Sequence, residues 1–184
     1  MKRAVFPQKA VFIVPGFRQK PKNKAYKEIR KILKSEGYFP VLVNVPWKKS
    51  TISENTDYFL KIYKKIKAKK KYVLGFSYGA MIAFIASTKV GASGLILCSL
   101  SPYFKEDTPF SQLHCGALAQ KIKAKKILML YGTKEARSLI RRVRGAFDQI
   151  CNSQKYLIPV LKTDHEIGDK RYLSTIHQAA RELL

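Results

Sequence analysis

Short apolar runs alternate with amphipathic stretches along the whole chain, and this alternation limits the possible fold more than any other feature of the sequence. The runs predict six strands, at residues 10–14, 39–45, 71–75, 94–99, 126–131 and 155–161. The stretches between them carry apolar residues at helical spacing. Strands that alternate with helices are typical of crossover connections in a parallel sheet. We therefore predict an α/β fold, a three-layer sandwich with a six-stranded, mostly parallel sheet and helices on both faces.

Local signals mark the ends of the expected helices. Asn23 is the expected N-cap of the first helix and Gly37 its expected stop, while Thr51 and Glu54 have the spacing of a capping box. The segment after Ser77 is apolar nearly all round, as expected of a helix buried against the sheet. The residues expected to face the core in the other helices are Tyr26, Ile29, Ile32 and Leu33; Tyr58, Ile62 and Ile66; Ala136, Leu139, Ile140, Val143, Phe147 and Ile150; and Leu173, Ile176, Ala180 and Leu183.

Length and composition favour one domain. The chain has 184 residues, enough for one well-buried core and too few for two large ones, so we expect a single domain over residues 1–184. Neither an internal repeat nor a Gly/Ser or Pro-rich linker divides it. Pro7 and Lys9 interrupt the first apolar run, which therefore indicates a strand rather than a secretion signal.

The sequence also favours a soluble, cytoplasmic protein. No apolar stretch approaches the roughly 18 residues that a membrane-spanning helix needs. Cysteines are odd in number and lack C-x-x-C spacing, a pattern that fits reduced thiols. The three cysteines are Cys98, Cys115 and Cys151.

The chain is strongly basic, with 36 Lys and Arg against 12 Asp and Glu, a net charge of +24. Basic residues concentrate at residues 18–34, 61–71, 121–126 and 137–144. One interpretation is a surface for nucleic acid, anionic membrane or an acidic partner. The other, which we favour, is a set of solvated helix faces, because the charges fall on several helices rather than on one stripe. Either interpretation predicts weak, nonspecific, salt-sensitive binding to polyanions.

A Gly-Phe-Ser-Tyr-Gly sequence at residues 75–79 joins the third expected strand to the apolar helix. This G-x-S-x-G pattern places Ser77 on a sharp strand-to-helix turn, where Gly75 and Gly79 let strand and helix approach without Cβ clashes. The backbone N–H of Tyr78 then lies at a helix start, where the dipole favours negative charge. In this context the chain resembles the α/β-hydrolase family, and in particular its small, single-domain serine hydrolases without a lid.

The resemblance implies a base for Ser77 just after the last strand. His165 occupies that position, in a polar turn before the final helix. The chain has two other histidines, His114 and His177, for which we expect structural or surface roles.

The resemblance also implies an acid after the fifth expected strand, often in the pattern Gly-x-x-Asp. The matching residues 132–135 place Glu135 there, with glutamate in place of aspartate. A competing interpretation is that Glu135 only begins a helix, where an acidic residue is favourable. Glu106 and Asp107 are alternative acids, while Asp164 is expected to point away from the neighbouring imidazole. The order Ser77, Glu135, His165 is that of the family.

An oxyanion hole in this family takes one N–H from the residue after the nucleophile and one from the loop after the first strand here. These would be the N–H groups of Tyr78 and Phe17, with Gly16 allowing close approach. The loop begins Pro-Gly instead of the usual His-Gly, and a simple structural turn is the competing interpretation.

Handedness rules and the resemblance together imply the strand order 2-1-3-4-5-6. The family's leading antiparallel strands would be absent, and residues 100–125, which we expect to be largely helical, leave no room for a cap domain.

The resulting hypothesis is a serine hydrolase that cleaves a carboxylic ester through an acyl-enzyme and requires neither cofactor nor metal. Its partner would be a small ester or related acyl substrate; thioester and amide cleavage remain open, and Arg18 and Lys20 would favour anionic groups. Loops at residues 46–48 and 101–104 would shape the pocket. The alternative is a catalytically silent binding module of the same fold that uses its basic faces.

Overall fold

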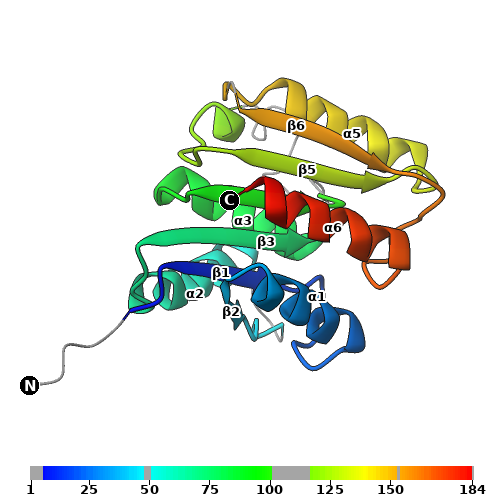
Figure 1. Ribbon diagram of the computed structural model, residues 1–184. Helices are drawn as coiled ribbons and strands as arrows, with labels where there is room; N and C mark the ends of the chain where they lie inside the picture. Colours follow the sequence, from blue (N-terminus) through cyan, green and yellow to red (C-terminus); the bar gives the residue numbers. More distant parts are fainter. Residues whose placement is uncertain (1–5, 48–50, 101–116, 153, 184) are drawn as a thin grey trace, which may run out of the picture.

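A computed structural model of the chain describes residues 6–47, 51–100, 117–152 and 154–183. Its six strands form one sheet in the order β2-β1-β3-β4-β5-β6, and every neighbouring pair is parallel (Figure 1). This confirms the predicted fold class and strand order. The strands are β1 (Lys9–Val14), β2 (Phe39–Leu42), β3 (Lys70–Phe76), β4 (Gly94–Cys98), β5 (Ile127–Gly132) and β6 (Lys155–Val160).

Helices cover both faces of the sheet, so that the molecule has three layers (Figure 1). Helices α1 (Lys24–Ser35) and α6 (Lys170–Glu182) pack on one face; α2 (Ile52–Lys65), α3 (Tyr78–Lys89) and α5 (Arg137–Asp148) pack on the other. Between β4 and β5 the structure describes a helical turn at residues 117–119. Residues 101–116, part of the segment for which we expected helix, lie outside the described residues.

The sheet separates two apolar cores, and β1 shows how its strands divide their side chains between them. Phe12 and Val14 point into the core under α2, α3 and α5, whereas Val11 and Ile13 point into the core under α1 and α6. Alternate residues of a strand face opposite sides of the sheet, so a strand buried on both faces is apolar throughout. Helix α3 is buried nearly all round, as predicted.

The ends of two helices follow the predicted signals. Thr51 and Glu54 form the capping box of α2, with each side chain accepting from the other residue's backbone N–H. Asn23 occupies the N-cap position of α1 without a side-chain cap hydrogen bond, and Gly37 follows that helix with a φ of 78°.

Several sequence predictions need correction. Ala136, which we expected to face the core, is the exposed N-cap residue of α5. The buried face of α2 contains Phe59 and Tyr63 rather than Tyr58, which is 36% exposed, because the helix is rotated to pack Phe59 and Tyr63 against Phe12. Strand β2 ends at Leu42, three residues earlier than expected. Leu42 pairs with Ile13 of the neighbouring strand β1, which ends one residue later at Val14. The residues after Leu42 therefore have almost no neighbouring strand to pair with.

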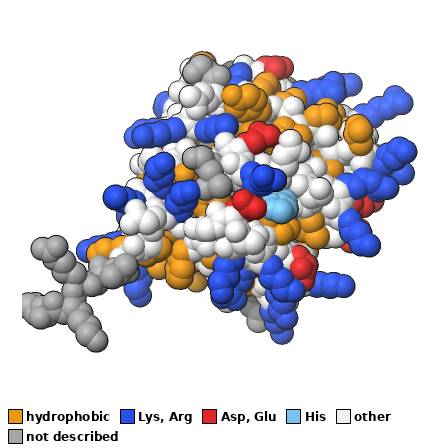
Figure 2. Space-filling view, in the orientation of Figure 1, with side chains coloured by type: hydrophobic (Ala, Val, Ile, Leu, Met, Phe, Trp, Pro, Cys, Tyr) orange, Lys and Arg blue, Asp and Glu red, His pale blue; other side chains and the backbone are white. Residues whose placement is uncertain are grey.

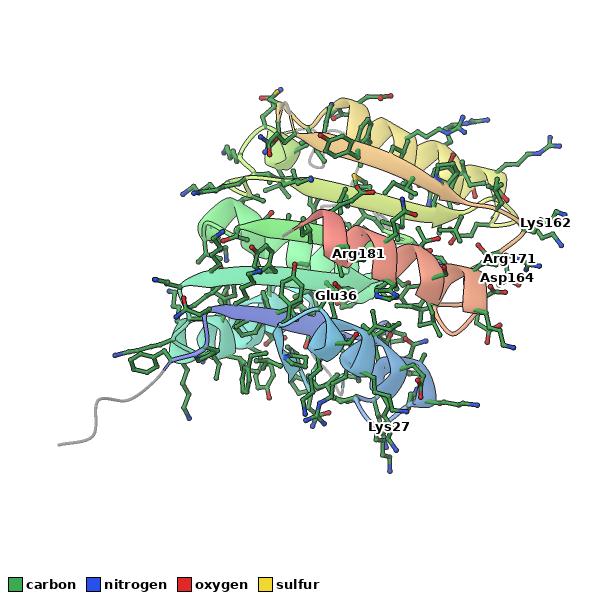
Figure 3. All side chains as sticks on the ribbon, in the orientation of Figure 1. Lys27, Glu36, Lys162, Asp164, Arg171 and Arg181 are labelled. Carbon is green, nitrogen blue, oxygen red and sulfur yellow. The ribbon has the colours of Figure 1, made fainter. Side chains whose placement is uncertain are left out.

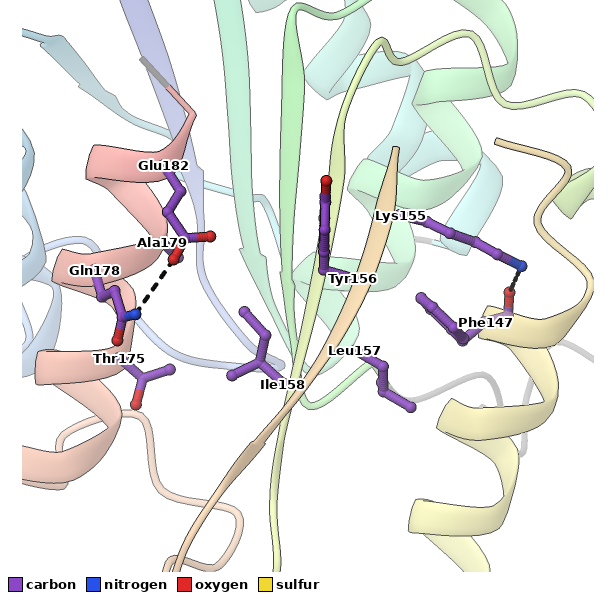
Figure 4. Close-up of a pocket in the computed structure, with 9 residues that line it drawn as sticks. All are labelled: Phe147, Lys155, Tyr156, Leu157, Ile158, Thr175, Gln178, Ala179 and Glu182. Atoms are coloured by element: carbon purple, nitrogen blue, oxygen red, sulfur yellow. Dashed lines mark hydrogen bonds between the residues drawn. The ribbon is translucent and has the colours of Figure 1, made fainter. Parts of the chain in front are cut away.

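The surface is basic on many sides. Figure 2 shows the face that carries α1 and α6, where Lys and Arg side chains lie around the rim of the view and acidic side chains are few. No helix in the described ranges is both long and apolar enough to cross a membrane. A groove of about 540 Å³ lies along edge strand β6 between α5 and α6, but no residue of the site described below lines it (Figure 4).

Candidate active site

The loops that follow the strands at the carboxyl edge of the sheet bring together the residues singled out in the sequence. In a parallel sheet all strands end at one edge, which is where such folds place their sites. Lys162 and Asp164, labelled in Figure 3, lie at this edge, in the loop that joins β6 to α6. His165 belongs to the same loop.

Ser77 forms the turn between β3 and α3 in a strained backbone conformation. Its φ of 53° and ψ of −116° are unusual for a residue other than glycine, and its N–H donates to the Cys98 carbonyl at 2.8 Å. A Cβ on Gly75 would lie 2.4 Å from the Gly79 carbonyl oxygen, and one on Gly79 would lie 2.2 Å from that of Val14. Only glycine fits at either position, so the turn can be as tight as the motif requires.

His165 reaches Ser77 from the other end of the chain. Its Nε2 lies 2.8 Å from Ser77 Oγ, within hydrogen-bonding distance, and its side chain is 41% exposed. The ring of Phe76 supports the imidazole, with centroids 5.0 Å apart. A Cβ on Gly132 would lie 2.6 Å from the Thr163 carbonyl oxygen, so β5 and the His165 loop are in close contact. The loop is thus held against the sheet while the imidazole edge remains open to solvent.

Glu135 lies behind His165 in the turn after β5. Its Oε1 is 3.6 Å from His165 Nδ1, longer than a hydrogen bond, and its side chain is 1% exposed. The Gly132 N–H donates to the same oxygen at 3.1 Å, whereas Oε2 is buried without a hydrogen-bond partner. A buried carboxylate next to an imidazole stabilises the imidazolium that forms when the ring takes a proton.

Two buried hydroxyl groups that sequence reasoning missed complete this cluster. Ser99 Oγ donates to Glu135 Oε1, and the Tyr172 hydroxyl oxygen lies 2.7 Å from Ser99 Oγ and 3.2 Å from the Leu130 carbonyl oxygen. We expected Ser99 to end a strand, but β4 ends one residue earlier and Ser99 has a φ of 47°. Its position at the carboxyl edge was the available signal; nothing in the sequence marks Tyr172.

The turn after β1 is held by its own hydrogen bonds. Gly16 N–H donates to the Tyr26 hydroxyl at 2.9 Å and to Gln19 Oε1 at 3.2 Å, and the Tyr26 hydroxyl donates to Gln19 Oε1. Burial raises the pKa of Tyr26, which keeps this hydroxyl protonated. The turn carries Phe17 to a position where its ring lies 5.7 Å from that of Tyr78. Both residues expected to supply oxyanion N–H groups therefore lie at this edge.

Three aromatic rings pack together beside Ser77. Trp47 lies 5.8 Å from Phe17 and 5.5 Å from Tyr78, and its indole N–H donates to the Gln19 carbonyl at 2.9 Å. Phe17 is 39% exposed, and the Arg18 guanidinium lies 5.0 Å from its ring. Tyr78 is buried, so Phe17 and the partly buried Trp47 form the exposed apolar surface of this aromatic cluster, with the Arg18 cation at its rim.

The remaining titratable candidates lie elsewhere or play other parts. His177 pairs with Glu36 at 2.6 Å between α6 and α1, away from Ser77, and Asp164 is exposed. Burial raises the pKa of the Cys98 thiol well above its ordinary range, so this nucleophile stays protonated. Glu106, Asp107, His114 and residues 101–104 lie outside the described residues. Within the described ranges no group of His, Cys, Asp and Glu could hold a metal ion.

No family model matches this sequence, and no curated protein does either. Solved structures match it closely in fold at low identity. A serine hydrolase without a lid from Xanthomonas campestris is 18% identical, with a TM-score of 0.72 over 99% of this chain and 83% of that one. Dienelactone hydrolase from Anabaena variabilis is 15% identical, with a TM-score of 0.80 over 95% and 84%.

The monoacylglycerol lipase of Paleococcus ferrophilus is also 15% identical, with a TM-score of 0.77 over 96% of this chain and 94% of the lipase. These likenesses cover nearly the whole chain and agree with the observed strand order. The chain therefore has the α/β-hydrolase fold.

Proposed function

We propose that the protein is a serine hydrolase that cleaves a carboxylic ester through an acyl-enzyme. The observation that carries this proposal is the 2.8 Å contact between Ser77 Oγ and His165 Nε2 across 88 residues of sequence. A serine hydroxyl is a weak nucleophile until a neighbouring base takes its proton. A backbone strained at Ser77 and a buried carboxylate behind the base support the same role.

The reaction follows from these positions. Ser77 Oγ attacks the ester carbonyl carbon as its proton passes to His165 Nε2, and Glu135 stabilises the imidazolium. The tetrahedral intermediate then collapses, the ester C–O bond breaks, and His165 returns the proton to the departing alcohol. Water attacks the acyl-enzyme in the same way, with its proton passing to His165 and then to Ser77 as the acid product leaves.

The negative charge of the tetrahedral intermediate needs donors that are in place beforehand. We assign the N–H groups of Phe17 and Tyr78 to this role. Gly79 supports the assignment, because its contact with the end of β1 keeps the turn after β1 beside Ser77. Each donor of this kind contributes about 3 kcal/mol to the transition state.

The names of similar structures favour esters over thioesters and amides. They include a monoacylglycerol lipase and the protein Est1E from Butyrivibrio proteoclasticus with bound ferulic acid. Phe17 and Trp47, the exposed part of the aromatic cluster, would contact an apolar or aromatic part of such a substrate, and Arg18 would favour an anionic one.

A fluorophosphonate probe with a fluorescent tag tests the proposal directly. We expect the wild type to be labelled once per chain, Ser77→Ala not to be labelled, and His165→Ala to be labelled at least about 100-fold more slowly. His177→Ala is the matched control, because His177 also pairs with a glutamate but lies away from Ser77. A series of p-nitrophenyl esters of increasing acyl length then measures hydrolysis.

A wild type that is neither labelled nor active on any ester would overturn the proposal. Tight polyanion binding by that same protein at physiological salt would favour the binding module instead.

A further inference from the structure

A chain of buried hydroxyl groups leads from α6 to the carboxylate of Glu135. Tyr172 lies in the first turn of α6 and is 0% exposed; Ser99 follows β4 and is also 0% exposed. Their oxygens are 2.7 Å apart, and Ser99 Oγ contacts Glu135 Oε1. Neither hydroxyl takes part in the reaction steps above, although both lie directly behind the carboxylate that faces His165.

The carboxylate sets the direction of the Ser99 proton in this chain. An ionised carboxylate only accepts, so Ser99 gives its single proton to Glu135 Oε1. Ser99 Oγ is then the acceptor toward Tyr172, whose single hydroxyl proton is shared between Ser99 Oγ at 2.7 Å and the Leu130 carbonyl oxygen at 3.2 Å. Burial raises the pKa of Tyr172 well above 10, which keeps this donor protonated. The resulting direction is Tyr172 to Ser99 to Glu135.

Hydrogen bonding at Glu135 is one-sided. Oε1 accepts from Ser99 and from the Gly132 N–H at 3.1 Å, and it is the oxygen 3.6 Å from His165 Nδ1. Oε2 has no hydrogen-bond partner. Two donors on one oxygen fix the rotation of the carboxylate and hold that oxygen at the imidazole.

The backbone conformation of Ser99 indicates that its hydroxyl group is needed at this position. Its φ of 47° lies in the left-handed region, where glycine is favoured over serine. Its N–H donates to the Leu130 carbonyl at 2.7 Å, so the strands themselves hold this conformation. Glycine would fit the backbone better but would lack the hydroxyl.

Tyr172 also touches the support of the imidazole. Its ring packs edge-on against Phe76 at 6.3 Å, and Phe76 packs against His165 at 5.0 Å. Tyr172 therefore contacts both Phe76, which supports the His165 ring, and Ser99, which donates to Glu135.

We propose that Ser99 and Tyr172 are positioning residues that hold Glu135 Oε1 toward His165 Nδ1. The proposal rests on the proposed serine hydrolase function, since it assigns a role only through Glu135 and His165. It predicts that loss of either hydroxyl slows the reaction of Ser77 while the fold remains intact.

The test is a double-mutant cycle on the rate at which the fluorophosphonate probe labels Ser77. We expect Tyr172→Phe and Ser99→Gly each to slow labelling about tenfold, the equivalent of about 1.4 kcal/mol. In a Glu135→Ala background the same two changes should alter the rate less than about twofold, because no carboxylate remains to be positioned. A melting curve for every variant reports folding, and Ser99→Gly carries the test if Tyr172→Phe unfolds.

Tyr38→Phe is the matched control. Tyr38 is a buried tyrosine just before β2, whose hydroxyl donates to the α6 carbonyl of Ala180 at 2.9 Å and whose ring packs on Tyr72 near the start of β3, whereas Ser77 follows the end of that strand. We expect it to be labelled at the wild-type rate.

Equal slowing in both backgrounds, or no slowing in the wild-type background, would overturn the positioning role while leaving the hydrolase proposal intact. Labelling that persists in Ser77→Ala would instead overturn the hydrolase proposal, and the positioning role with it.

Discussion

Replacing Gly79 with alanine tests whether the close approach of α3 to the end of β1 sets the geometry of the site. A Cβ there would lie 2.2 Å from the Val14 carbonyl oxygen and 2.3 Å from that of Pro15. Contacts below 3.0 Å are essentially never seen, so helix and turn must separate by about 0.8 Å. Both obstacles are backbone atoms, which no side-chain rotation can relieve.

The expected cost follows from two opposing effects. Overpacking of this kind costs about 1–3 kcal/mol, whereas alanine is favoured over glycine inside a helix by about 1 kcal/mol. The difference is a net loss of up to about 2 kcal/mol, which lowers Tm by up to about 8 °C for a chain of this length. The separation also moves Phe17 away from Ser77, and a displacement near 1 Å in a catalytic arrangement costs about 100-fold in rate.

Gly145→Ala provides the control within the same fold. Gly145 also lies in a helix, but a Cβ there meets nothing within 4 Å, so Tm should rise by about 2–4 °C and labelling of Ser77 should be unchanged. Differential scanning fluorimetry and the labelling rate measure both quantities. If Gly79→Ala melts as high as Gly145→Ala and is labelled at the wild-type rate, the close approach does not constrain the site.

Three further predictions concern single groups. Glu135→Gln should keep its Tm within a few degrees, since a neutral amide costs less to bury, yet lower ester hydrolysis by about 10²–10⁴-fold; hydrolysis at the wild-type rate would rule out the acid role. Burial raises the pKa of Tyr63 to about 12, so above pH 10 the folded chain keeps a proton that the unfolded chain releases. The free energy of unfolding should therefore be fully retained below pH 10 and fall as the pH rises toward 12. In Tyr63→Phe the fall should be less steep. In a Cys115→Ala chain, mass spectrometry should show that iodoacetamide modifies the exposed Cys151 under native conditions and the buried Cys98 only after unfolding. Rapid modification of Cys98 in the folded chain would contradict its burial.

Much of the fold could be predicted from the sequence because strands buried on both faces are apolar throughout. The run at residues 71–75 and the motif that follows it specify a strand, a tight turn and a buried helix within a short stretch, and the structure has β3, the turn at Ser77 and α3 there. The position of Ser77 on a strained turn was predictable for the same reason, since Gly75 and Gly79 act on their immediate neighbours.

The sequence predicted less where the rotation of a helix decides which residues are buried, or where pairing with a neighbouring strand decides where a strand ends. Tyr58 and Phe59 are adjacent apolar residues, and only the contact of Phe59 with Phe12 decides which of them is buried. Likewise β2 ends at Leu42 because β1 ends, although the apolar run continues.

The sequence by itself determined the layers and the local geometry at Ser77 and, through the resemblance to the α/β-hydrolase family, indicated the candidates Glu135 and His165. Only the tertiary structure decided that His165 touches Ser77, that Phe76 supports its ring, and that Ser99 and Tyr172 reach Glu135. The physical reason is that periodicity and turn chemistry act over a few residues, whereas Ser99 and Tyr172 lie 73 residues apart. A contact of that range leaves no pattern in the chain, and it forms only once the parallel strands end at a common edge.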